Sequence, residues 1–185
     1  GDEVLITLAE HASNTLPWFE VAKHTGAIIK YIDLDEEGKV TLENVKKAVT
    51  EHTKIISLAQ ITNVLGYLAP IKEICNFAHE HDIIVCVDGA QSAPHHAVDV
   101  QDLDVDFFAF SGHKMCGPTG VGVLYGKYHL LDEMTPTRFG GGSNARYNSC
   151  GLVKLKNAPT KFETGTPNIE GVIGLGSAIE YLQNI

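Results

Sequence analysis

Residues 107–114 read Phe-Phe-Ala-Phe-Ser-Gly-His-Lys, an apolar, strand-like segment that leads directly into a polar sequence ending in Lys114. A Gly-Pro-Thr-Gly turn follows at residues 117–120. Lysine is seldom buried unless it is paired, so a lysine held between a core strand and a tight turn is a candidate for covalent chemistry. We therefore expect Lys114 to present a reactive amine at the end of a strand.

A second strand-like run, Ile83-Ile84-Val85-Cys86-Val87, ends at Asp88. Short continuous apolar runs are typical of buried strands, and open α/β sheets bind ligands at the carboxyl ends of their strands. A lysine that can form a Schiff base and an aspartate for the ring nitrogen are the two protein groups that pyridoxal phosphate (PLP) chemistry requires. Asp88 and Lys114 together therefore predict a PLP site.

Strand and helix signals alternate along the rest of the chain. We predict further strands at residues 4–8, 27–32, 55–59 and 120–125, and helices that begin near Thr15, Thr41 and Pro70, with a last amphipathic helix carrying Val172, Leu175, Ile179 and Leu182. Residues 144–165 have weak periodicity, and no element is predicted there. The β-α-β-α-β order predicts a three-layer α/β/α fold with a mostly parallel central sheet and right-handed crossovers.

Composition limits the possible partners. The chain has 185 residues, 44% of them hydrophobic, which is enough apolar surface for the core of a single domain. Its net charge of −9, without a basic cluster, argues against nucleic acid and against an anionic membrane surface. The four cysteines form no CxxC pair, so we expect free thiols and a reducing cytoplasm. No apolar run approaches the ~20 residues that span a bilayer, and we expect no signal peptide.

Other motifs with possible functions have simpler explanations. Neither His79 with His81 nor His95 with His96 has the acidic and cysteine spacing of a metal site, so we expect no metal and a solvated helix end at residues 79–81. The glycines at 140–142 are not followed by Gly-Lys-Ser/Thr, which argues against a nucleotide P-loop.

Several polar residues follow predicted strands: His11, Asn63, Asp88, Gln91, Ser111, His113 and Lys114. With these residues the chain resembles the fold-type I PLP enzymes of the class V aminotransferase group. It is most similar to the SUF-type cysteine desulfurases and selenocysteine lyases. The similar segments are Glu10-His11 with Ser13-Asn14 and Pro17-Trp18, Ser57 through Asn63-Val64-Leu65-Gly66, Val87 to Gln91, Ser111 to Lys114 with Gly117 to Gly120, Gly140 to Gly142, and Gly165-Thr166-Pro167-Asn168.

The resemblance implies a role for each matching residue. His11 would stack on the pyridine ring and take part in proton transfer near it, and Asp88 would bind the ring nitrogen. Gln91 would bind the phenolic oxygen, with Asn63 nearby, and Lys114 would form the Schiff base. Ser111 and His113 would bind the phosphate, and Thr166 would reach the phosphate of a neighbouring subunit in a homodimer. Cys116 stands where relatives often have an aromatic residue. We expect it to pack, and a reactive thiol beside Lys114 is the alternative.

The resemblance also implies an activity. A cysteine desulfurase converts L-cysteine to alanine and leaves sulfur as an enzyme-bound persulfide for iron–sulfur cluster assembly, with a sulfur-acceptor protein as a further partner. A selenocysteine lyase acts on L-selenocysteine. In this family the sulfur-accepting cysteine and the arginine for the substrate carboxylate lie downstream of the Gly-Thr-Pro-Asn segment, and a phosphate-binding threonine loop lies upstream of Gly1.

We therefore expect residues 1–185 to be a single PLP-binding large domain. It would be a fragment of a longer enzyme, without the N-terminal segment and the C-terminal small domain. Two alternatives remain open. The parent could be another class V enzyme, an aminotransferase or a kynureninase-like lyase, because Lys114 and Asp88 do not determine which bond at the α-carbon breaks. The fragment itself could be a non-catalytic folded scaffold.

Overall fold

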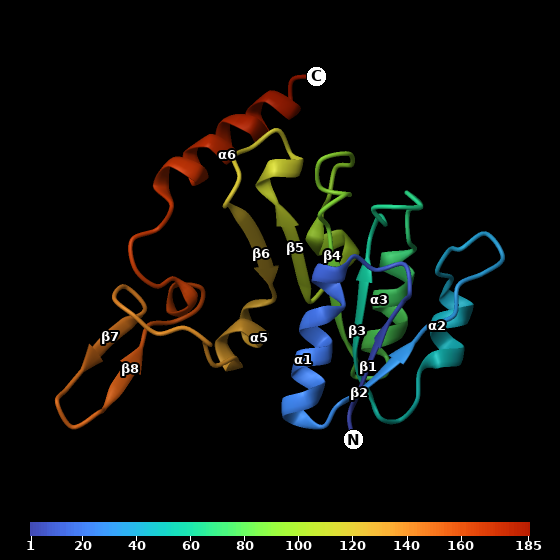
Figure 1. Cartoon of the computed structure of the whole chain (residues 1–185), viewed down its shortest axis with the longest axis horizontal. Coiled ribbons are helices and arrows are strands. Elements are labelled where there is room, and N and C mark those ends of the chain that lie inside the picture. Colours follow the sequence, from blue (N-terminus) through green and yellow to red (C-terminus); the bar gives the residue numbers. More distant parts are fainter.

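A six-stranded sheet in the order β2-β1-β3-β4-β5-β6 forms the centre of the computed structural model, which describes residues 1–185 (Figure 1). The first five strands pair in parallel, and β6 runs antiparallel to β5. The strands are β1 (Glu3–Ile6), β2 (Ile28–Tyr31), β3 (Thr53–Ala59), β4 (Ile84–Asp88), β5 (Phe107–Ser111) and β6 (Gly122–Gly126). The predicted mostly parallel α/β fold is therefore confirmed.

The helices are α1 (Leu16–Thr25), α2 (Leu42–Ala48), α3 (Ile71–His79), α4 (Val100–Leu103), α5 (Tyr128–Glu133) and α6 (Ile169–Leu182), with 3-10 turns η1 (Ala12–Asn14), η2 (Gly112–Lys114) and η3 (Thr160–Phe162). The first four connect the parallel strands, and α1, α2 and α3 begin where the sequence predicted. The Thr41 side chain accepts the Asn44 N–H at 3.1 Å and so caps α2. Gly26 ends α1 with φ +76°, a conformation that glycine adopts without steric cost. None of the helices combines the length and apolar character needed to cross a bilayer.

The hydrophobic core lies on the face of the sheet that α2 and α3 cover. Every inward position of α3 that the pattern predicted is buried, namely Ile71, Ile74, Cys75 and Ala78. They pack with the buried strand residues Val85, Val87 and Phe108. The apolar side chains on this face are removed from water and closely packed, and their burial is the main source of the fold's stability.

The opposite face of the sheet is less densely covered. There α1 contributes Trp18, α5 contributes Leu130 and Met134 directly follows α5, while the strand residues Ile84 and Cys86 remain half-buried. In β4 the alternation of side chains between the two faces puts Val85 and Val87 into the core and Cys86 and Asp88 toward this open face. The fold therefore leaves room for a groove on this side of the sheet.

The C-terminal part of the chain differs from the predicted pattern. In α6 the buried residues are Gly171, Leu175 and Ala178, whereas Val172 is 57% exposed. The helix contacts the rest of the molecule along a narrower stripe than its apolar periodicity predicts. Residues 144–165, where we predicted no element, include a hairpin of β7 (Asn144–Tyr147) and β8 (Val153–Leu155) that extends away from the main sheet (Figure 1).

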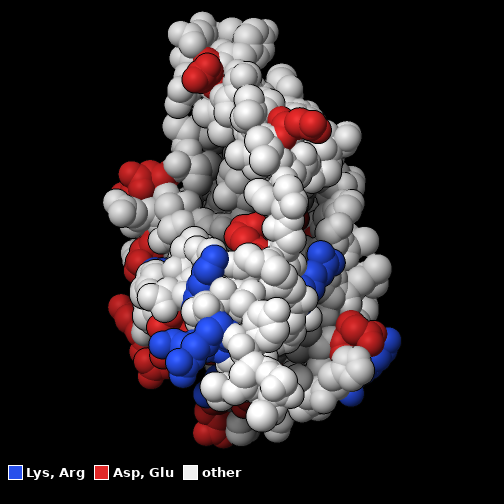
Figure 2. Space-filling model, turned by 90° about the vertical axis from the view of Figure 1, so that its left-hand side faces the viewer, with Lys and Arg blue, Asp and Glu red and all other residues white.

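Charged side chains do not gather in one place on the face that Figure 2 shows. Acidic and basic groups lie close to one another over the middle and lower parts of this face, whereas the upper part carries only a few acidic groups. The hairpin segment 144–155 has two basic residues, Arg146 and Lys154, and no acidic one. The net charge of −9 is thus not concentrated in a single acidic surface on this face.

An ionic cluster joins the end of α3 to the segment that leads into β5. The two ring nitrogens of His79 lie 3.1 Å from Asp104 Oδ2 and 2.9 Å from Asp106 Oδ2. Lys127 Nζ lies 2.8 Å from Asp104 Oδ1 and 2.9 Å from Asp106 Oδ1. The expectation of a solvated helix end at residues 79–81 is therefore wrong for His79, because two carboxylates far along the chain bind its ring.

The cluster is asymmetric in burial. Asp106 is only 7% exposed at its side chain, and its Oδ2 also accepts the Val85 N–H at 2.7 Å. Burial alone would raise the pKa of Asp106, but the hydrogen bonds from Val85, Lys127 and His79 outweigh it and lower this pKa. The hydrogen bond from Lys127 likewise lowers the pKa of Asp104. Both carboxylates therefore stabilise the fold in their ionised form.

We predict that Asp106→Asn lowers the free energy of unfolding by roughly 3 kcal/mol near neutral pH, because Lys127 and His79 lose a buried counter-charge. The pKa of Asp106 is lowered, so this stabilisation is present above the ordinary pKa of 3.8 and is lost as the pH falls below it. The difference between wild type and variant, measured by urea unfolding from pH 7 to pH 3, should shrink toward acid.

Asp102→Asn is the matched control, because the Asp102 carboxylate is 60% exposed in its ion pair with Lys72. Exposed pairs contribute little, so this variant should unfold like the wild type. Equal unfolding midpoints for Asp106→Asn and Asp102→Asn would contradict a stabilising role for the cluster.

Candidate active site

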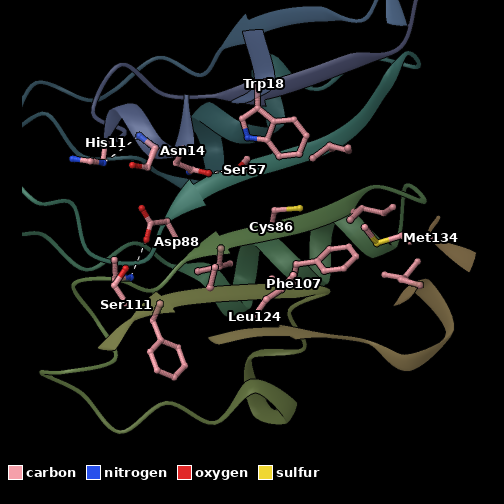
Figure 3. Close-up of a pocket in the computed structure, with 18 of the residues that line it drawn as sticks. His11, Asn14, Trp18, Ser57, Cys86, Asp88, Phe107, Ser111, Leu124 and Met134 are labelled. Atoms are coloured by element: carbon pink, nitrogen blue, oxygen red, sulfur yellow. Dashed lines mark hydrogen bonds between the residues drawn. The ribbon is translucent and has the colours of Figure 1, made fainter. Parts of the chain in front are cut away.

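A groove of about 920 Å³ lies on the open face of the sheet, between the strands and the helices α1 and α5. Its floor is apolar and its polar residues gather where β4 and β5 end (Figure 3). The lining includes Trp18, Ile55, Ile84, Cys86, Phe107, Leu124 and Met134 along the floor and walls, and His11, Asn14, Asp88, Ser111, His113 and Lys114 at the polar end. This combination of an apolar hollow with converging polar groups is typical of a small-molecule site.

Asp88 is the last residue of β4, and parallel pairing places it opposite Ala59 of β3 and Ala109 of β5. The carboxylate points into the groove, between His11 on one side and Ser111 on the other (Figure 3). Its Oδ1 accepts the Ala90 N–H at 2.9 Å, and no hydrogen bond within the chain engages Oδ2. One carboxylate oxygen is thus fixed by the turn while the other is free to bind a ligand.

The chain turns sharply after β5. A Cβ at Gly112 would approach the Val121 side chain to 2.9 Å, so only glycine fits between the end of β5 and the residue that precedes β6. The turn continues as η2, which places Ser111, His113 and Lys114 around the same end of the groove. Lys114 is half-buried, and its amine forms no ion pair or hydrogen bond within the chain, so it is available to a ligand.

His11 lies at the end of the connection that follows β1 and caps η1. Its Nδ1 accepts the Ser13 N–H at 3.2 Å. An Nδ1 that accepts a hydrogen bond carries no proton, so the neutral ring holds its proton on Nε2. The ring itself is exposed and faces the groove from the side opposite to Ser111 (Figure 3).

Three predicted site residues do not line this groove. Asn63 lines a smaller neighbouring hollow of about 440 Å³, which also includes His11 and Glu10. Gln91 lies in the turn after Asp88, where its backbone carbonyl accepts a hydrogen bond from His95 Nδ1 at 2.7 Å. Thr166 is exposed in the loop before α6. Their predicted contacts with a cofactor stay predictions.

The groove also contains residues to which the sequence analysis gave no role. Trp18 and Cys86 form part of its walls, and the side chains of Asn14 and Ser57 are hydrogen-bonded to one another at 2.8 Å (Figure 3). The signal for Cys86 was present in the sequence, because it lies two residues before Asp88 on the same strand and must share its face. The Asn14–Ser57 pair had no such signal, because it joins two segments through the tertiary fold.

The donors at the polar end fit PLP chemically. A free primary amine, a carboxylate with one free oxygen, an imidazole and a hydroxyl converge on one groove from three separate segments, and each matches a group of the cofactor. Gly89 adds a steric condition, because a Cβ there would overlap the ring of buried Phe108. The turn that carries Asp88 is thus packed tightly on the core.

The four cysteines are all free thiols but differ in environment. Burial raises the pKa of both Cys75 and Cys86 to about 12, so neither is a thiolate at neutral pH. Cys116 and Cys150 are exposed. The expectation that Cys116 packs is therefore wrong, because η2 ends at Lys114 and the chain then turns at Cys116, which lies on the surface with φ +58°.

Comparison with known proteins agrees with this geometry. The family model for "Aminotransferase class-V" matches residues 1–185. A probable cysteine desulfurase of Halalkalibacterium halodurans is 52% identical over all of this chain and 45% of its own length. The cysteine desulfurase CsdA of Escherichia coli superposes with a TM-score of 0.96 at 43% identity, over 100% of this chain and 46% of that one.

A structure with lower sequence identity belongs to an enzyme that is named as a C-S lyase. The cystine C-S lyase C-DES, solved with its product cysteine persulfide, has a TM-score of 0.88 at 28% identity and is matched over 50% of its chain by all of this one. A variant of that lyase was solved with glycine covalently linked to the PLP cofactor. The present chain thus spans about half the length of the proteins that it matches.

We predict that Gly89→Ala destabilises the fold by roughly 1–3 kcal/mol, since the added methyl group must displace the buried Phe108 ring or the Asp88 turn. The melting temperature measured by circular dichroism should fall accordingly. Gly176→Ala is the control, because nothing lies within 4 Å of a Cβ at that helical position. That change should leave the stability unaltered or raise it by about 0.5–1 kcal/mol, and a loss as large as that of Gly89→Ala would refute the packing argument.

A second prediction concerns thiol reactivity. Iodoacetamide at pH 8 should modify Cys116 and Cys150 and leave Cys75 and Cys86 unmodified, because a thiol with a pKa of about 12 is almost entirely protonated at this pH. Peptide mapping by mass spectrometry measures the modified fraction at each site. In urea all four cysteines should react, which is the control. Fast labelling of Cys86 in the folded protein would contradict the burial of its thiol in the groove wall.

Proposed function

This chain belongs to the class-V aminotransferase family, and on that basis we propose that it is the PLP-binding part of a cysteine desulfurase. The convergence of Lys114, Asp88 and His11 on one groove at the carboxyl ends of the strands carries this proposal. Identities of 43–52% to cysteine desulfurases over the whole chain support it. The substrate of the whole protein would be L-cysteine, with alanine and enzyme-bound sulfur as products.

PLP, when bound, supplies an electron-withdrawing ring that stabilises negative charge at the substrate's α-carbon. Asp88 would keep the ring nitrogen protonated through its free oxygen, while Ala90 holds the other oxygen in place. Lys114 would bind the cofactor's aldehyde through its unpaired amine and, once the substrate amine replaces it, move protons at the α-carbon.

The remaining polar residues would orient the cofactor. His11 would lie against one face of the ring, and its Nε2–H is the proton available on the groove side when the ring is neutral. Ser111 and His113 would donate to phosphate oxygens, and Gln91 and Asn63 would act near the phenolic oxygen. The apolar floor below them excludes water, which strengthens each of these polar interactions.

Several finer assignments belong to the same proposal. Residues 1–185 would form one cofactor-binding domain in which Thr166 reaches the phosphate site of a second copy in a homodimer. Its exposed position before α6 leaves it free to do so. Sulfur would pass to an acceptor protein for iron–sulfur cluster assembly, and selenocysteine would be a possible second substrate. The four free thiols support a reducing compartment such as the cytoplasm.

We predict that PLP added to the intact protein gives a visible absorbance band and that borohydride reduction leaves a pyridoxyl group on Lys114, identified by mass spectrometry. Lys114→Ala should abolish this adduct and slow sulfide release from cysteine by at least roughly a hundredfold, since the residue both binds the cofactor and moves protons. Lys47→Ala, at an exposed position of α2, is the matched control and should behave like wild type.

Asp88→Asn separates binding from chemistry. The variant should still form the adduct on Lys114 but turn over cysteine at least roughly a hundredfold more slowly, because a neutral amide does not hold the ring nitrogen protonated. Unchanged turnover would remove the assigned role of Asp88. Sulfide release that survives Lys114→Ala would contradict the proposed function as a whole.

A further inference from the structure

Glu10 lies directly before His11, and its carboxylate connects three parts of the chain. Thr7 Oγ1 donates to Glu10 Oε1 at 2.9 Å, and Asn14 Nδ2 donates to Oε2 at 2.7 Å. Asn14 Oδ1 in turn accepts the hydroxyl of Ser57 at 2.8 Å. Thr7 and Ser57 are buried; Thr7 directly follows β1 and Ser57 lies in β3, so both ends of this hydrogen-bonded chain are anchored at the sheet.

This chain of hydrogen bonds brackets His11. Glu10 precedes it and Asn14 follows it, and the His11 carbonyl accepts the Asn14 N–H at 2.8 Å. His11 is exposed, so the orientation of its imidazole ring depends on the turn and on the 3.2 Å bond between Nδ1 and the Ser13 N–H. If the turn loosens, the ring can rotate and either nitrogen can carry the proton.

The carboxylate of Glu10 also lies within electrostatic range of Asp88. Burial raises the pKa of Glu10, the hydrogen bonds from Asn14 and Thr7 oppose this, and the charge of Asp88 raises it further. An ionised carboxylate is therefore disfavoured at this position by burial and by the charge of Asp88. The two oxygens of the carboxylate accept from Thr7 and Asn14 at the same time, and so join the end of β1 to the 3-10 turn that His11 caps.

We propose that Glu10, acting through Thr7, Asn14 and Ser57, is a positioning residue that holds His11 in one orientation and one tautomer over the cofactor site. The functional meaning of this inference, an oriented His11 at a cofactor site, rests on the proposed function. The hydrogen bonds themselves are observed within the chain and do not depend on that function. Glu10 touches neither substrate nor cofactor in this role.

The test uses the intact protein labelled with ¹⁵N, with the His11 ring signals assigned by comparison with His11→Gln. The wild type should show a protonated Nε2 and an unprotonated Nδ1 at a pH where the ring is neutral. Glu10→Ala and Asn14→Ala should give signals averaged between the two tautomers. The PLP dissociation constant, measured by absorbance titration, should rise roughly tenfold, the scale expected for one or two lost hydrogen bonds.

Two further variants separate position from charge and guard against misfolding. Glu10→Gln keeps an oxygen for Thr7, and its amide can donate to Asn14 Oδ1 once the Asn14 amide reverses toward Ser57, so the wild-type tautomer should return. Ser57→Ala removes one hydroxyl at the far end and should reproduce part of the Glu10→Ala effect in a folded protein. Glu20→Ala, which loses only exposed ion pairs with Lys23 and His24, is the matched control and should match wild type.

The outcomes distinguish this inference from the proposed function. A wild-type protein that binds no PLP overturns the proposed function, whereas the ring signals still report whether Glu10 orients His11. Unchanged His11 signals in both Asn14→Ala and Ser57→Ala, in a protein that binds PLP, overturn the positioning role alone. Averaged signals in Glu10→Gln would show that the charge of Glu10 matters and would contradict an effect through hydrogen-bond geometry.

Discussion

Parallel hydrogen bonding between β3, β4 and β5 is the constraint on which the site depends. Its register sets Ala59, Asp88 and Ala109 side by side. Because the strands run in the same direction, each ends at the same edge of the sheet, and the turns that follow them meet there. His11, Asp88 and Lys114 come from three distant segments, and no local interaction could bring them together. A slip of one residue in β4 would point Asp88 into the core and Val87 into the groove.

Much of this arrangement could be read from the sequence, because the signals are local. The spacing of Ile71, Ile74, Cys75 and Ala78 fixes the inward face of α3, and the apolar run before Asp88 identifies the strand that carries it. Most of the features that were missed are products of the tertiary fold, whereas the position of Cys86 followed from its spacing to Asp88 on β4. His79 meets Asp104 and Asp106 only after α3 has folded back on the sheet, and Glu10 reaches Ser57 only through Asn14. No pattern of a few residues encodes such contacts.

The two faces of the sheet have different roles, because successive side chains along each strand point to opposite faces. One face is dry and tightly packed, so that even a methyl group at Gly89 would collide with Phe108. The other carries the groove, the half-buried Cys86 and the free oxygen of Asp88. Rigid packing behind the turn is what allows an unpaired carboxylate and an unpaired lysine to stay in place before any ligand arrives. Preorganisation of this kind lowers the cost of binding a cofactor.

The two edges of the sheet differ in how they would meet another strand. At one edge β2 carries Lys30, whose amine is bound to the buried Glu3, and a charge on an edge strand discourages pairing with a foreign chain. At the other edge β6 consists of Gly-Val-Leu-Tyr-Gly, without any charge, and Leu124 is 58% exposed. Self-association through β-sheet extension would therefore begin at β6, and the colloidal behaviour of the domain depends on what covers that one strand.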